Sequence, residues 1–178
     1  MHRADIVFRM DSITLIRDTH RWMRWLTGRT LEAASALPDA DFRREFSIGS
    51  GSVHGTLTHL LGAERIWMNA IHGDATAVMA STQEFPSIDS IRKGWPVVRG
   101  KWDTYLNQLT DDECSRVVMR VRDGKEVRQL VRDILVQLPT HALYHNAQIS
   151  FMFRQMGHSL ADSSWILWRR EQLAQAKQ

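Results

Sequence analysis

The sequence is short of cysteine, with Cys114 as the single one among 178 residues. One cysteine cannot form an intrachain disulfide, and it excludes a Cys-x-x-Cys metal site. We therefore expect a reducing, cytoplasmic setting, since disulfides are typical of secreted proteins. Long apolar runs are missing as well, because no window approaches about 18 consecutive apolar residues. The chain is thus predicted to have no membrane span, and the charges near its start argue against a signal peptide.

The chain also lacks a large excess of charge of one sign, because its 23 basic residues are nearly balanced by 20 acidic ones and the net charge is +3. The only Arg-Arg doublets are Arg43-Arg44 and Arg169-Arg170, and neither is interleaved with aromatic side chains that could stack on bases. We therefore expect no nucleic-acid partner. The basic residues are better explained as a solvated surface.

Tryptophan and methionine, in contrast, are numerous, with seven and eight copies. Large and adaptable side chains of this kind favour a substantial core, and they also suit an interface between two copies. We expect a homodimer. The length fits one domain over residues 1–178, with its core at about 11–157.

Helical periodicity dominates the chain and predicts an all-α fold with four long helices. The expected ranges are 11–36, 53–71, 86–109 and 129–155. Pro96 falls inside the third range, so we expect either a kink there or a helix that begins near it.

The segments between these helices have a different character. Residues 72–85 read as a long loop. Residues 114–128 are β-rich around Asp123-Gly124, a typical two-residue turn, which predicts a small hairpin before the fourth helix. The tail at 159–177 is predicted to form a short amphipathic helix packed on the outside.

Two histidines stand out on the fourth helix, His141 and His145. At a spacing of four residues they lie about 40° apart in projection, on the face that should line the core. Buried imidazoles need partners, which a metal ion or other core polar groups could supply. The motif lacks the Glu of His-Glu-x-x-His, so a metalloprotease is not indicated.

The second helix adds His59 and Glu64 to the candidates. His59 lies beside Ala63 and Ile66, whose arrangement leaves room for the ring to point at another helix. Three neutral imidazoles would suit a divalent metal and leave one position open for water or substrate. Glu64 lies in the apolar arc, either as a carboxylate at a site or as the partner of an arginine on another helix.

The remaining histidines are given less weight. His20 follows the apolar side of the first helix and is a minor candidate for a site. His54 projects about 140° away from His59, so we expect it to be exposed. His2, His72 and His158 lie in a terminus or at helix ends, where solvent or capping accounts for them.

Two runs of the sequence resemble the DinB/YfiT-like family. One is Gly51-Ser-Val-His-Gly-Thr-Leu-Thr-His59-Leu-Leu-Gly-Ala-Glu64-Arg-Ile-Trp67, which is similar to the second-helix signature, and the other is His141-Ala-Leu-Tyr-His145-Asn-Ala-Gln148, which is similar to the fourth-helix motif. The resemblance implies a four-helix bundle with one long crossover. It implies His59, His141 and His145 as metal ligands, with Gln148 supporting them or orienting a substrate.

The chain departs from the family pattern at two positions. Many relatives carry a histidine where Gln137 stands, and a basic residue where Asn146 stands. Neither departure removes a ligand.

The resemblance also implies a class of chemistry. Some members of the family are thiol-dependent S-transferases, which would use the metal to activate a low-molecular-weight thiol toward a small-molecule substrate. Three histidines favour zinc or nickel, and after them iron. Two alternatives stay open: a metal-dependent hydrolase with Glu64 or another carboxylate as base, and a non-enzymatic, stress-associated bundle with a structural metal.

Overall fold

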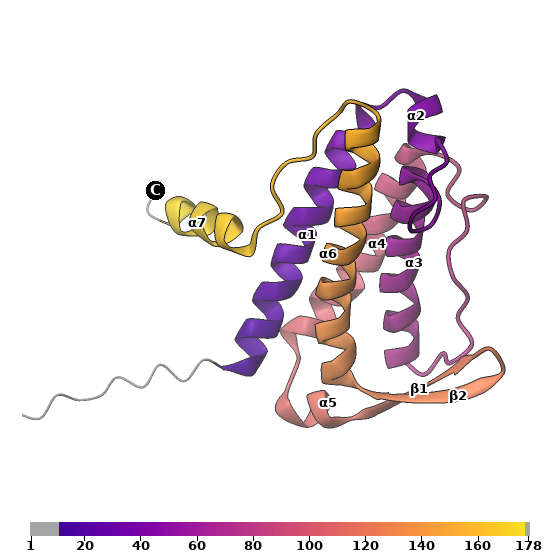
Figure 1. Cartoon of the computed structure of the whole chain (residues 1–178). Helices are drawn as coiled ribbons and strands as arrows, with labels where there is room; N and C mark the ends of the chain where they lie inside the picture. The colour runs from indigo at the N-terminus through magenta and orange to yellow at the C-terminus, as the bar shows by residue number, and fades with distance from the viewer. Residues whose placement is uncertain (1–10, 177–178) are drawn as a thin grey trace, which may run out of the picture.

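A computed structural model describes residues 11–176, so His2 and the charged start of the chain lie outside the described part. Four long helices form the body: α1 (Ser12–Ser35), α3 (Val53–Ile71), α4 (Ile88–Asn107) and α6 (Val131–Gln155). Figure 1 shows them side by side as a bundle. The predicted all-α, four-helix architecture is confirmed. Within residues 11–176, every helix is too short or too polar to span a lipid bilayer.

Short polar side chains set where the helices begin. The Asp11 carboxylate accepts from the Ile13 amide at the start of α1, and Ser52 accepts from the Gly55 amide at the start of α3. At α4, Ser87 and Ser90 form a reciprocal capping box. The alternative that this helix begins near Pro96 is wrong, because these caps place its start well before the proline.

The long segment between α3 and α4 makes the crossover expected from the sequence. In Figure 1 it runs back along the length of α3, so that α3 and α4 point in the same direction. The segment packs closely, because a side chain at Gly62 of α3 would overlap the Met79 side chain and the Ala80 backbone. Two short helices, α2 (Asp39–Arg43) and α5 (Asp111–Ser115), were not anticipated.

The hairpin before the fourth long helix is also confirmed, as β1 (Val117–Arg122) and β2 (Lys125–Leu130). Its turn residues Asp123 and Gly124 have φ values of 51° and 73°, as a type I′ turn requires. The register pairs Arg120 with Val127 and Val118 with Gln129. Side chains of these four residues therefore lie on one face of the hairpin, and Figure 1 shows the hairpin at one end of the bundle.

A continuous apolar core joins the four long helices. Its largest fully buried side chains include Trp95, Trp102, Met23, Leu57, Leu61, Ile134, Leu138 and Met152. The last helix, α7 (Trp165–Gln175), lies against α1 outside this bundle, as expected. Trp168 is buried there, and Trp165 meets Trp22 edge-on at 5.7 Å.

His20 of α1 replaces a backbone hydrogen bond that is missing in α6. Pro139 has no N–H, so the carbonyl of Leu135, one turn earlier, lacks its helical donor. The fully buried His20 supplies the replacement, because its Nε2–H donates to the Leu135 oxygen at 2.9 Å. His20 is therefore a packing residue between two helices.

Candidate metal centre

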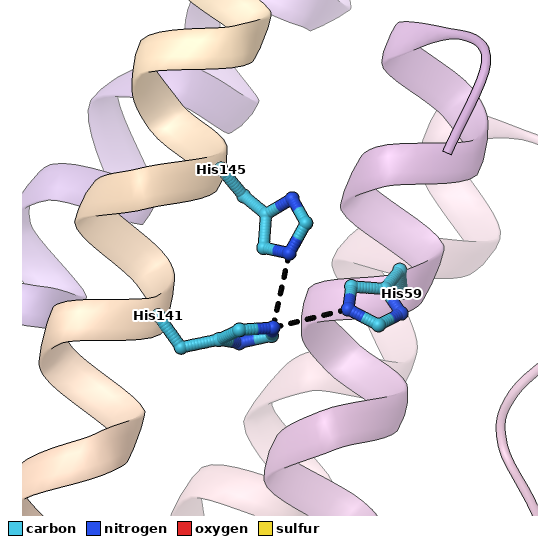
Figure 2. Close-up of side chains that lie close together, drawn as sticks. All are labelled: His59, His141 and His145. Atoms are coloured by element: carbon cyan, nitrogen blue, oxygen red, sulfur yellow. Dashed lines mark hydrogen bonds between the residues drawn. The ribbon is translucent and has the colours of Figure 1, made fainter. Parts of the chain in front are cut away.

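Three histidines from two helices meet at one point of the bundle. His59 comes from α3, and His141 and His145 come from successive turns of α6. The Nε2 atom of His141 lies 3.1 Å from Nε2 of His59 and 3.0 Å from Nε2 of His145. Figure 2 shows the three rings converging from the two facing helices. The structure thus brings together the three histidines that were predicted as metal ligands.

The surroundings keep these imidazoles neutral. Burial lowers the pKa of His141 to about 4, with a further contribution from His145 and His59. Burial also lowers the pKa of His59 and of His145. Neutral imidazole is the form that binds a metal, so the site is ready for one at neutral pH.

Gln148 fixes the orientation of one ring. Its Oε1 lies 2.7 Å from Nδ1 of the buried His145, and an amide oxygen only accepts, so Nδ1 carries the proton. The lone pair of His145 Nε2 is therefore directed at the other two histidines. Gly49 makes this possible, because any side chain there would overlap Gln148 Oε1, and its φ of 60° also favours glycine. The role expected for Gln148, support of a ligand, agrees with this contact.

The donor set fits a divalent metal. Two ring nitrogens, from His59 and His145, face Nε2 of His141. In a neutral ring this atom carries at most one proton, so hydrogen bonding can satisfy only one of the two nitrogen–nitrogen contacts well. Two nitrogens bound to one zinc at about 2.0–2.1 Å in tetrahedral geometry are about 3.3 Å apart. The observed separations of 3.0 and 3.1 Å are close to that value. Within residues 11–176, no other group of three or more His, Cys, Asp or Glu side chains is close enough together to hold a metal ion.

A cavity of about 580 Å³ opens beside the histidines. His59 and His141 form part of its wall and are partly exposed, whereas His145 is buried behind them. Gln137, one turn before His141, also lines this cavity. A metal held by the three imidazoles would therefore have an open side toward a space large enough for a small molecule.

Glu64 does not belong to this group. Its carboxylate is buried against α4, where Oε1 accepts from Trp95 Nε1 at 2.8 Å and from Arg99 at 3.4 Å. The interpretation as the partner of an arginine on another helix therefore agrees with these contacts. The other interpretation, a base at the site, is wrong because Glu64 and His59 point toward different neighbouring helices.

The expectation that His54 is exposed is wrong, since its exposed fraction is 4%. The segment before α4 covers it, and His54 Nε2–H donates to the Phe85 carbonyl at 2.7 Å. Periodicity placed His54 on the side of α3 away from His59, but that side is covered as well. Asn146 is also buried, and its side-chain oxygen accepts from Thr30 of α1 at 2.6 Å. Asn146 therefore faces α1 and plays no part at the histidines.

Other residues of the cavity were missed from the sequence. Trp67 of α3, Arg120 and Gln129 of the hairpin, and Asp133 of α6 all line it. The alternation of Val118, Arg120 and Arg122 along β1 could have shown that two arginines share the buried valine's face. What alternation could not show is that this face covers the end of the α3/α6 cleft.

Known proteins place this arrangement in a family. YfiT from Bacillus subtilis, described as a probable metal-dependent hydrolase with an unusual four-helix bundle topology, has 16% identity and a TM-score of 0.59, over 79% of this chain and 89% of its own. A DinB-like protein from Bacillus cereus has 17% identity and a TM-score of 0.59, over 81% and 94%. None of the curated proteins matches the chain. At these identities the two structures support the fold, whereas the model of the DinB family matches residues 10–169, nearly the whole bundle and its histidines. The chain belongs to the DinB family.

Proposed function

We propose that this protein is a metal-dependent enzyme that transfers a low-molecular-weight thiol to an electrophilic small molecule. The observation that carries the proposal is the convergence of three neutral imidazoles at the wall of a 580 Å³ cavity. His59, His141 and His145 would hold the metal. A structural metal site normally has four protein ligands, whereas three ligands and an adjacent cavity are typical of catalytic sites.

The lack of a nearby carboxylate favours a thiol over water as the nucleophile. Within the described residues, no Asp or Glu belongs to the group formed by the three histidines. Asp133 lines the same cavity, but it precedes His141 by eight residues, about 12 Å along the helix axis. A bound divalent metal would lower the pKa of a thiol so far that no general base is needed.

In this reaction the thiol loses its proton to solvent, and its sulfur forms a bond to an electrophilic carbon of the substrate. The leaving group departs with the electron pair of the bond that breaks. The protein's own contribution is to keep the three imidazoles neutral and oriented, with Gln148 holding His145 by the 2.7 Å hydrogen bond. The cavity positions the substrate beside them.

Metal binding and thiol transfer are tested together. Protein purified without a histidine tag is reconstituted with zinc, nickel or iron, and its metal content is measured. Conjugation of monochlorobimane is then followed with a panel of thiols that includes cysteine and glutathione. We expect about one metal per chain and thiol conjugation in the wild type, and loss of both in His59→Ala and His145→Ala.

His72→Ala is the matched control, since His72 is exposed at the end of α3 and lies outside the group of three. Because His145 is buried, circular dichroism first establishes that each variant folds. A wild-type protein that binds none of the three metals after reconstitution would overturn the proposal.

A second candidate function is metal-dependent hydrolysis. The similarity of the fold to YfiT, which is described as a probable metal-dependent hydrolase, favours it. Hydrolysis of 4-nitrophenyl acetate by the metal-loaded protein without added thiol, abolished in His59→Ala, would support this function over thiol transfer.

A further inference from the structure

Arg120 is a cation without an anion at the far end of the cavity. It lies on the face of β1 that is turned toward the helices, and its guanidinium is 4.9 Å from the centre of the Trp67 ring. Its side chain is partly buried, and no carboxylate within residues 11–176 lies within ion-pair distance of it. Burial and the neighbouring Arg122 lower the pKa of the Arg120 guanidinium, which is the expected effect on a cation that lacks a counter-ion.

The other charges around the cavity have different surroundings. Arg122 is exposed and has Asp123 at 3.7 Å. Asp133 is exposed and has Arg132 at 3.8 Å. Arg120 is thus the one basic side chain of the cavity wall that is both partly buried and unpaired within the described residues.

Gln129 provides a second, independent sign of a ligand. It lies diagonally across the hairpin from Arg120, on the same face, and it lines the same cavity. Its side-chain oxygen is buried and has no hydrogen-bond donor within residues 11–176. A buried acceptor without a donor is costly, and a bound molecule with an N–H or O–H group would satisfy it.

The distance between the two ends of the cavity sets the size of the molecule. His59 and Trp67 are eight residues apart on α3, which is about 12 Å along the helix axis. A ligand that reaches from the histidines to the guanidinium on Trp67 therefore needs a body of about 8–12 Å, which fits a cavity of about 580 Å³.

We propose that the cavity takes a small anionic substrate whose carboxylate or phosphate binds Arg120, whose N–H or O–H group donates to Gln129, and whose other end lies at the three histidines. This inference rests on the proposed function, because it names the substrate class of the same site. Guanidinium is suited to it, since it binds planar carboxylates and phosphates with two parallel hydrogen bonds. Trp67 keeps the guanidinium plane in place.

Binding to the full-length protein without added metal is measured by isothermal titration calorimetry. The probes are N-acetylglycylglycine, its uncharged C-terminal amide, and inorganic phosphate. We expect saturable binding of at least one anionic probe, and at least about tenfold weaker binding of the uncharged amide. Stronger binding of the peptide carboxylate or of phosphate decides which anion the site accepts.

Arg120→Gln should lower the affinity for the anionic probe by about tenfold or more and leave the affinity for the uncharged amide unchanged. Arg128→Gln is the matched control, since Arg128 lies on the outer face of the same hairpin, paired with Met119. Gln129→Leu should lower the affinity for N-acetylglycylglycine more than the affinity for inorganic phosphate, because only the peptide has an N–H group that can donate to Gln129.

Equal binding of the carboxylate and its amide, equal losses in Arg120→Gln and Arg128→Gln, or no saturable binding of any probe would overturn the inference. A zinc titration of the same samples keeps the two proposals apart. Arg120→Gln should bind zinc like the wild type, whereas His59→Ala should lose zinc and keep the anion.

Discussion

Replacing His20 by leucine removes the donor that the Leu135 carbonyl has in place of the amide missing at Pro139. In the native protein this bond is 2.9 Å long and buried. Leaving a buried carbonyl without a donor costs about 1–3 kcal/mol. We therefore expect His20→Leu to lower the free energy of unfolding by about 1–3 kcal/mol at pH 8.

The same substitution should be far less costly in a protein that also carries Pro139→Ala. An alanine at this position restores the backbone N–H, which can then donate to the Leu135 oxygen as in an ordinary helix turn. The two positions are thus coupled, and we expect a coupling free energy of about 1–2 kcal/mol in a double-mutant cycle of His20→Leu and Pro139→Ala. The measurement is urea unfolding followed by circular dichroism for all four proteins.

The pH dependence of the wild type supplies an independent check. Burial lowers the pKa of His20 from 6.5 to about 4. The unfolded chain therefore takes up a proton at this site before the folded one does, so stability is complete above pH 6.5 and falls as the pH drops toward 4. The loss between pH 8 and pH 5 is about 2 kcal/mol from this group. His20→Leu has no such group, so its stability does not show this loss. The difference in the free energy of unfolding between the wild type and His20→Leu should therefore shrink by about 2 kcal/mol from pH 8 to pH 5.

Two results would contradict this reasoning. One is a cost of His20→Leu that is the same, within about 0.5 kcal/mol, with and without the Pro139→Ala substitution. The other is a deficit that stays constant from pH 8 to pH 5.

Three further predictions concern the support of His145 by Gln148, the buried Glu64 and the oligomeric state. Gln148→Leu should lower the affinity for zinc by about 10- to 100-fold in a competition titration with a chelator, because His145 loses the acceptor that orients its ring. Gln148→Glu should keep the affinity for zinc. An unchanged affinity in Gln148→Leu would show that the hydrogen bond has no such role. Glu64→Leu should lower the free energy of unfolding in urea by about 3–5 kcal/mol, because Arg99 is left partly buried without its partner. The fraction of this variant that folds should bind zinc like the wild type. A loss of zinc binding in the folded fraction would show that Glu64 acts at the metal site. The homodimer expected from the tryptophan and methionine content stays a prediction, and sedimentation equilibrium with a monomer mass would reject it.

The elements of the fold could be predicted from the sequence where local signals agree. The range expected for the second helix, 53–71, matches the bounds of α3, because a long apolar arc fills it and polar and small residues follow its end. Asp123-Gly124 was enough to predict the hairpin turn. The helices α2 and α5 were missed, because elements of five residues carry too little periodicity to be recognised.

The candidate metal centre was predictable for a similar reason. The spacing of His141 and His145 places both rings on one face of a helix, whatever that helix packs against. Gln148 lies three residues after His145, so its support of that ring is also encoded locally. The place of Arg120 and Gln129 at the cavity was not predictable, because the sequence of a two-stranded hairpin does not reveal which part of the bundle it covers.

His59 and Glu64 show most clearly where the sequence stops being informative. Both lie in the apolar arc of α3, five residues and about 140° apart. The sequence alone determined that each lies on the apolar side of α3 and needs a partner there. Only the tertiary structure decided the partners, because α6 packs on the side of α3 that carries His59 and α4 packs on the side that carries Glu64. One residue therefore faces two histidines and a cavity, and the other faces a tryptophan and an arginine in the core.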